Sequence, residues 1–140
     1  MLVRMQILIA ISVLSTAHTI AADLQQQARD ALQAASRYFA QDVALRGGYV
    51  YYYSPDLKKR MGEGVASASQ IWVQPPGTPT VGMAFLKAWR ATGDEAHLKA
   101  ATVAAEALIY GQLKSGAWTG SIDFDPKGNT GEYRNGKGNG

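Results

Sequence analysis

The chain has 140 residues, no cysteine and a formal net charge of +3, from 14 basic and 11 acidic residues. This length is enough for one small hydrophobic core. The lack of cysteine excludes thiol catalysis and Cys-ligated zinc, and a charge this close to neutrality gives no indication of nucleic-acid binding.

Residues 1–22 predict a secretory signal peptide. Arg4 supplies the positive charge that precedes the apolar core, and Ile7 to Leu14 is too short a core to span a bilayer. An uncleaved membrane anchor is the alternative. Cleavage after Ala22 would remove Arg4 and no acid, so the formal charge would fall from +3 to +2. Together with the absence of cysteine, this predicts a periplasmic or secreted protein that has no membrane contact after signal cleavage.

The first mature element expected is a helix over residues 24–45, since apolar side chains recur there with the 3.6-residue period and Gly47-Gly48 follows. Tyr49 to Tyr53 then predicts a short extended aromatic segment. The basic run Lys58-Lys59-Arg60 is expected to be solvated.

Residues 77–118 predict two antiparallel helices joined by a tight turn. Thr78 is the expected N-cap of the first helix, with Pro79 at its first position. Gly93 would end that helix in the left-handed conformation, and Asp94 would cap the second helix at once. Gly116 is the expected end of the second helix.

These alanine-rich helices indicate an all-α fold class. Residues 126–140 are rich in Gly and Asn and have almost no apolar content, so no packed element is expected there. A disordered tail is one interpretation. We favour a connecting loop to a helix outside this chain, because the apolar stripes of the helices are too wide to cover one another.

The stretch from Ala88 to Trp118 resembles the repeat unit of (α/α) toroid enzymes, and most closely the pectic acid lyases, pectate lyase family ten. Ala91 to Glu95 forms the turn motif of that family, followed by Leu98 and a pair of alanines, and then by Gln112. Gly116-Ala117-Trp118 departs from the family at Ala117, where glycine is usual, and the proline and glutamine that often follow the family tryptophan are also absent.

The resemblance implies antiparallel helical hairpins of an incomplete (α/α) toroid, formed by residues 23–125. It implies that this chain is the N-terminal portion of an exported pectate lyase-like enzyme that cleaves polygalacturonate by β-elimination. In that chemistry an arginine is the base and calcium neutralises the uronate carboxylate. No catalytic residue of the family can be matched to a position in this sequence.

Trp72 and Trp118 are the main candidates for substrate binding. They stand before the start and after the end of the helical pair, and antiparallel helices bring those two ends together. Flat aromatic faces suit the C–H groups of sugar rings. The alternative is that each indole only covers a helix end. Trp89 falls on the apolar stripe and is expected in the core, and His97 is expected at the surface, with no assigned role.

Arg60 and Arg134 could pair with a uronate carboxylate. Glu63, between two glycines, is a further candidate for substrate binding, as a general acid or ligand, although a lone loop glutamate is usually only exposed. Asp123 and Asp125 stand two apart, so in an extended segment both carboxylates would point the same way and could hold calcium. A solvated loop is the alternative.

Two further functional classes remain open. One is a small exported helical module that binds a partner without catalysis. The other is a glycoside hydrolase, which would need two carboxylates across a cleft. Only Glu63, Asp123 and Asp125 could contribute to such a pair, and nothing in their spacing places them suitably.

Overall fold

The computed structural model describes residues 21–127, and the chain divides into two units, one ending at Ala35 and the other beginning at Ser36. The described part of the first unit, residues 21–35, is helical throughout, and nearly all its side chains are exposed. Apart from residues 21, 22, 126 and 127, the predicted signal peptide (1–22) and the Gly/Asn-rich segment (126–140) lie outside the described residues. No helix between residues 21 and 127 is both long and apolar enough to cross a membrane.

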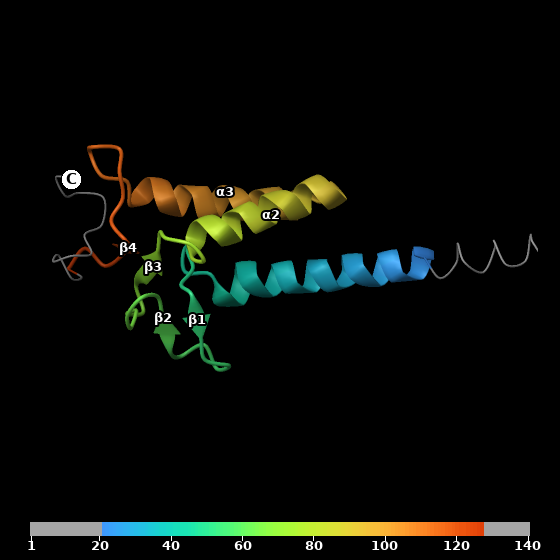
Figure 1. Ribbon diagram of the computed structural model, residues 1–140, viewed down its shortest axis with the longest axis horizontal. Coiled ribbons are helices and arrows are strands. Elements are labelled where there is room, and N and C mark those ends of the chain that lie inside the picture. The colour runs from blue at the N-terminus through green and yellow to red at the C-terminus, as the bar shows by residue number, and fades with distance from the viewer. Residues whose placement is uncertain (1–20, 128–140) are drawn as a thin grey trace, which may run out of the picture. The chain divides into compact units, whose positions relative to one another are not determined.

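The second unit begins with residues 36–38, which are helical and lead into the π-helix η1, Phe39–Val43. The predicted helical hairpin follows later in the chain as α2, Thr78–Thr92, and α3, Glu95–Tyr110, which lie side by side (Figure 1). Gly93 adopts the left-handed conformation with φ 71°, and the Asp94 carboxylate accepts a hydrogen bond from the Ala96 N–H at 2.9 Å. The predicted turn between the two helices is therefore confirmed.

The outer ends of the hairpin differ from the prediction. Gly77, not Thr78, occupies the N-cap position of α2, and the Thr78 side chain makes no cap hydrogen bond there. Helix α3 ends before Gly111 instead of near Gly116, because a neighbouring segment packs against this end of the helix. A Cβ atom on Gly111 would lie 2.1 Å from the side chain of Ile122.

Within residues 21–127, four short strands form two antiparallel pairs (Figure 1). Strand β1, Tyr52–Tyr53, pairs with β2, Arg60–Met61, so that Tyr52 lies opposite Met61. Strand β3, Gln70–Trp72, pairs with β4, Ser121–Asp123, so that Ile71 lies opposite Ile122. The second pair joins the segment before the helical hairpin to the segment after it.

The β3–β4 pair is part of the core, and this corrects the predicted fold class. Ile71 and Ile122 are fully buried and pack with Phe124 and with Ala107 of α3. The prediction of an all-α fold, built from antiparallel helical hairpins of an incomplete (α/α) toroid, is therefore wrong: the fold combines helices with two small antiparallel sheets. The sheets cover apolar helix surface that the prediction assigned to further helices.

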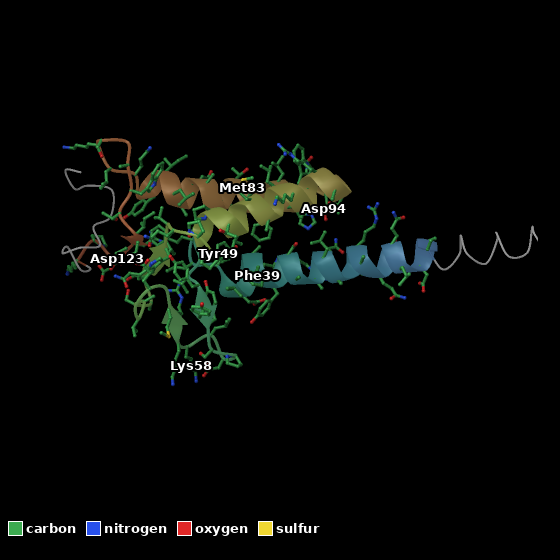
Figure 2. All side chains as sticks on the ribbon, viewed as in Figure 1. Phe39, Tyr49, Lys58, Met83, Asp94 and Asp123 are labelled. Carbon is green, nitrogen blue, oxygen red and sulfur yellow. The ribbon has the colours of Figure 1, made fainter. Side chains whose placement is uncertain are left out.

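Tyr49 connects the helices to the segment before β1. It packs in a buried cluster with Val43 and Phe85, and its ring centre lies 6.2 Å from that of Phe39 (Figure 2). The Tyr49 hydroxyl donates a hydrogen bond to the Phe39 carbonyl at 3.2 Å. Burial, and to a smaller extent the nearby Tyr53, raise the pKa of Tyr49 far above its ordinary value.

Two side chains on the helical hairpin also differ from expectation. His97 is buried in the first turn of α3, not exposed, and its Nδ1 lies 3.2 Å from the Thr92 hydroxyl. Trp89, expected in the core, is only half-buried, and its indole N–H donates to the Glu95 carboxylate at 3.3 Å. Both contacts join the end of α2 to the start of α3.

Candidate functional site

Trp72 is a core residue and offers no face to a sugar. Its side chain is only 1% exposed, and Gly62 lies directly against the indole, where an added Cβ would be 2.1 Å from the ring. The prediction of an exposed sugar-binding face on Trp72 is therefore wrong. The predicted proximity of the two helix ends is confirmed, since Trp72 pairs with Ser121 and the Val73 N–H donates to the Gly120 carbonyl at 2.9 Å.

Trp118 is the most exposed of the three tryptophans, since Trp89 is half-buried and Trp72 is buried. Its side chain is 41% exposed, while its indole N–H donates to the Leu108 carbonyl, in the last turn of α3, at 2.8 Å. The edge of the indole thus covers a helix end, as the alternative interpretation expected, and much of the ring still faces water. A hydrogen bond at one edge fixes the orientation of an aromatic ring without using its faces.

The loop that carries Trp118 is held by its own hydrogen bonds. The Gln112 side chain donates to the Gly116 carbonyl at 2.9 Å, and the Leu113 N–H donates to the Ala117 carbonyl at 2.9 Å. Gly116 has φ 87°, a conformation that glycine adopts without strain. Lys114 is exposed in the same loop. The loop therefore presents a fixed aromatic ring with an ammonium group four residues before it.

Arg60 is held against the inner side of the β1–β2 hairpin. Its Nη1 donates to the Ser67 carbonyl at 2.9 Å, and its Cζ lies 5.9 Å from the centre of the Tyr53 ring. Its Nη2 is buried and has no hydrogen-bond partner among residues 21–127. The guanidinium is therefore held by Ser67 and Tyr53 within the fold, which argues against the predicted pairing of Arg60 with a uronate. Arg134, the other arginine considered, lies outside the described residues.

Glu63 is exposed in the turn between Gly62 and Gly64. After burial, its negative charge is the second cause of the raised pKa of Tyr51. The Gly62 N–H donates to the Gly64 carbonyl at 2.9 Å, so the turn is closed and holds Glu63 at its tip. This position leaves the Glu63 carboxylate accessible to a ligand.

Asp123 and Asp125 each bind the backbone that follows them. The Asp123 carboxylate accepts from the Asp125 N–H at 2.9 Å, and the Asp125 carboxylate accepts from the Lys127 N–H at 2.9 Å. Asp123 is buried at the end of β4 and Asp125 is exposed beyond it, so the two carboxylates differ in their access to a metal ion. The described residues contain no group of three or more His, Asp or Glu side chains suited to a metal ion. A calcium role for the pair stays a prediction from resemblance.

Sequence reasoning missed the exposed residues of the β1–β2 hairpin. Tyr52 is 67% exposed and lies opposite the exposed Met61, whereas Tyr53 and Arg60 occupy the inner face. The alternation of side chains along a strand was the available signal, since it places Tyr52 and Tyr53 on opposite faces; the Tyr51 ring lies edge-on to that of Tyr52, with ring centres 6.4 Å apart.

Comparison of the chain with family models, curated proteins and solved structures found no match. The chemistry of the candidate site is therefore inferred from its side chains and their geometry.

Proposed function

We propose that this chain binds an acidic polysaccharide, with polygalacturonate as the expected ligand, through the exposed face of Trp118. The observation that carries the proposal is the combination of a fixed indole edge, 2.8 Å from the Leu108 carbonyl, with a ring that is 41% exposed. A pyranose ring stacks its C–H groups on such a face, and a ring already held in place loses little entropy on binding.

The preference for an acidic sugar is supported by charge. Lys114 is exposed in the loop that carries Trp118, four residues before the indole. An ammonium group near the stacking face attracts a uronate carboxylate through a charge-assisted hydrogen bond. A neutral polysaccharide would stack on the ring without this second contact.

We propose β-elimination of polygalacturonate, the reaction implied by the resemblance to pectic acid lyases, as the activity that this binding serves. The proposal gives the chain the role of holding the polysaccharide. It assigns neither the arginine base nor the calcium ligands to described residues, because Arg60, Asp123 and Asp125 are engaged in contacts of the fold. The same observation favours the second candidate, an exported binding module without catalysis.

Equilibrium binding of the full chain to polygalacturonate tests the stacking role. We expect Trp118→Ala to weaken binding by about tenfold, which corresponds to the loss of one aromatic contact. Trp118→Phe keeps a flat ring but removes the indole N–H that reaches Leu108, so it should bind within about threefold of the wild type. Trp89→Phe is the matched control, since it also removes an indole N–H bond, the one to Glu95.

Two results would contradict the stacking role. One is wild-type affinity in Trp118→Ala. The other is equal loss in Trp118→Ala and Trp118→Phe, which would show that only the hydrogen bond to Leu108 matters. Release of unsaturated product from polygalacturonate, measured with and without calcium, separates the two candidates: product supports the lyase, and binding without product supports the module.

A further inference from the structure

The β1–β2 hairpin has two faces of different character. Tyr53 and Arg60 are paired on the inner face, where the guanidinium lies over the tyrosine ring. Tyr52 and Met61 are paired on the other face, and both are exposed. Directly opposite residues of an antiparallel pair point to the same side, so these two side chains are neighbours.

Two more side chains extend the exposed face. Val65 forms an antiparallel bridge with Met61 and is 84% exposed. Lys59 precedes Met61 by two residues, and the Ser54 N–H donates to its carbonyl at 3.0 Å, so the pairing of the hairpin reaches this residue. Alternation along the strand places Lys59 on the side of Met61. We call Tyr52, Lys59, Met61 and Val65 the hairpin outer face.

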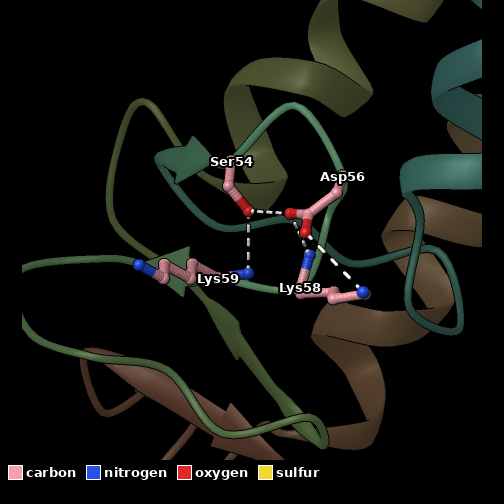
Figure 3. A network of polar contacts seen from close by, with 4 residues as sticks. All are labelled: Ser54, Asp56, Lys58 and Lys59. Carbon is pink, nitrogen blue, oxygen red and sulfur yellow. Dashed lines mark hydrogen bonds and ion pairs between the residues drawn. The ribbon is translucent and has the colours of Figure 1, made fainter.

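The ammonium group of Lys59 is available to a ligand. The neighbouring loop is fixed by Ser54, whose hydroxyl donates to the Asp56 carboxylate at 2.6 Å and accepts from the Lys59 N–H at 2.9 Å. Figure 3 shows the Lys58 ammonium turned toward Asp56, at 3.9 Å, and the Lys59 side chain running away from it. No ion pair joins Lys59 to another residue of the described range 21–127.

The size and charge of the hairpin outer face suit one sugar unit. Four side chains from a short hairpin provide far less area than the roughly 800 Å² per partner of a stable protein interface. A pyranose ring is matched by a single aromatic ring such as that of Tyr52, and a carboxylate is matched by one lysine. Lys58, labelled at the end of the hairpin that lies away from α2 and α3 (Figure 2), is paired with Asp56, so Lys59 is the lysine of this hairpin left for the carboxylate.

We propose that the hairpin outer face is a second carbohydrate contact that takes one acidic sugar unit, with the ring on Tyr52 and the carboxylate on Lys59. This inference rests on the proposed function, since it assumes that the chain binds an acidic polysaccharide. It gives the hairpin a second contact that favours acidic over neutral sugars, in addition to Lys114 in the loop that carries Trp118.

The test compares the binding of the full chain to polygalacturonate and to galactan, the neutral polymer of the corresponding sugar. Lys59→Gln should weaken polygalacturonate binding by about two- to fivefold, the range of an exposed ion pair, and leave galactan binding unchanged. Tyr52→Ala should weaken both by about three- to tenfold. Lys58→Gln is the matched control, because it removes the same charge one residue away, from a lysine that already pairs with Asp56. It should weaken polygalacturonate binding by less than about half as much as Lys59→Gln does.

High salt should abolish the difference in polygalacturonate affinity between Lys59→Gln and the wild type, because the proposed ion pair between Lys59 and the uronate carboxylate is exposed. The inference is overturned if Lys59→Gln behaves like Lys58→Gln, or if Tyr52→Ala binds like the wild type. Loss of binding in Trp118→Ala alone would leave the proposed function standing and overturn only the second contact. If the hairpin variants lose binding while Trp118→Ala binds like the wild type, the hairpin contact stands and the stacking role of Trp118 is overturned.

Discussion

The Thr78 hydroxyl accepts a hydrogen bond from the Tyr49 N–H at 3.0 Å and donates one to the Tyr49 carbonyl at 3.2 Å. One side chain thus provides both partners that a neighbouring strand would offer to Tyr49. Thr78 is fully buried, and the same Tyr49 carbonyl also accepts from the Trp72 N–H at 2.8 Å. The start of α2 is therefore joined to the segment before β1 and to β3 through the backbone of a single residue.

Replacing Thr78 with valine should destabilise the fold by about 1–3 kcal/mol. Valine keeps the shape but leaves the buried Tyr49 N–H without a partner, whereas the Tyr49 carbonyl keeps its bond from Trp72. Thr78→Ser retains the hydroxyl and should lose less stability than Thr78→Val. Urea unfolding of both variants measures the difference, and equal stability of Thr78→Val and Thr78→Ser would show that the hydroxyl is not needed.

Alkaline pH should destabilise the fold through Tyr49. Its folded-state pKa is raised, mainly by burial, so the folded chain keeps a proton that the unfolded chain loses near about pH 10. Ionisation then favours the unfolded state, and the free energy of unfolding should fall above this pH by up to about 1.4 kcal/mol per pH unit. Below it, Tyr49 adds no pH dependence.

Urea unfolding from about pH 8 to about pH 11 checks this dependence. Tyr49→Phe removes the ionisable group and should flatten the slope, although it also loses the hydrogen bond to Phe39 and so starts from a lower stability. The pKa of Tyr51 is raised as well, so some slope should remain. A slope identical to the wild type in Tyr49→Phe would rule out Tyr49 as its source.

Gly62 and Gly64 should respond very differently to alanine. A methyl group at Gly62 would lie 2.1 Å from the Trp72 indole, whereas one at Gly64 would meet nothing within 4 Å. Gly62→Ala should therefore cost about 1–3 kcal/mol through overpacking, and Gly64→Ala should change stability by less than about 0.5 kcal/mol. Thermal unfolding of the pair tests how closely the turn covers Trp72, and equal melting temperatures would contradict that packing.

The hydroxyl groups of Ser121 and Thr92 should differ in how much they contribute to the stability of the fold. The Ser121 hydroxyl is buried with no hydrogen-bond partner among the described residues, so Ser121→Ala should be neutral or stabilise the fold by up to about 1 kcal/mol. The Thr92 hydroxyl donates to the Ala88 carbonyl at 2.8 Å and accepts from the Asp94 N–H at 3.2 Å. Because its one proton is used on Ala88, the nearby His97 Nδ1 must be the donor in their contact.

Thr92→Val removes all three contacts and should cost about 1–3 kcal/mol. Denaturant unfolding of Ser121→Ala and Thr92→Val gives the comparison. A larger loss in Ser121→Ala than in Thr92→Val would mean that the Ser121 hydroxyl has a partner that stabilises the fold.

The helical hairpin could be predicted from sequence because its signals are local. Gly93 and Asp94 end one helix and start the next through their own backbone preferences and side-chain chemistry. The sheets could not be predicted in this way, since Ile71 and Ile122 are far apart in the chain and their pairing depends on tertiary packing. The end of α3 at Tyr110 follows from the same long-range contact, through Gly111 and Ile122.

The candidate site could be predicted in part. The position of Trp118 at the end of the helical pair suggested a contact surface, and the structure leaves its ring accessible. Trp72 has the same relation to the helices but is buried, because β3 pairs with β4 and Gly62 covers its indole. Residue type alone does not distinguish these two tryptophans, and the exposure of Tyr52 depends on a strand pairing that is only two residues long.

The most direct test of carbohydrate binding at Trp118 is NMR of the three indole N–H groups during titration with oligogalacturonate. Trp118→Phe assigns one signal by its disappearance. We expect that signal to shift with saturation on ligand addition, while the signal of the buried Trp72 stays in place. An unchanged Trp118 signal at saturating ligand would contradict the proposed function.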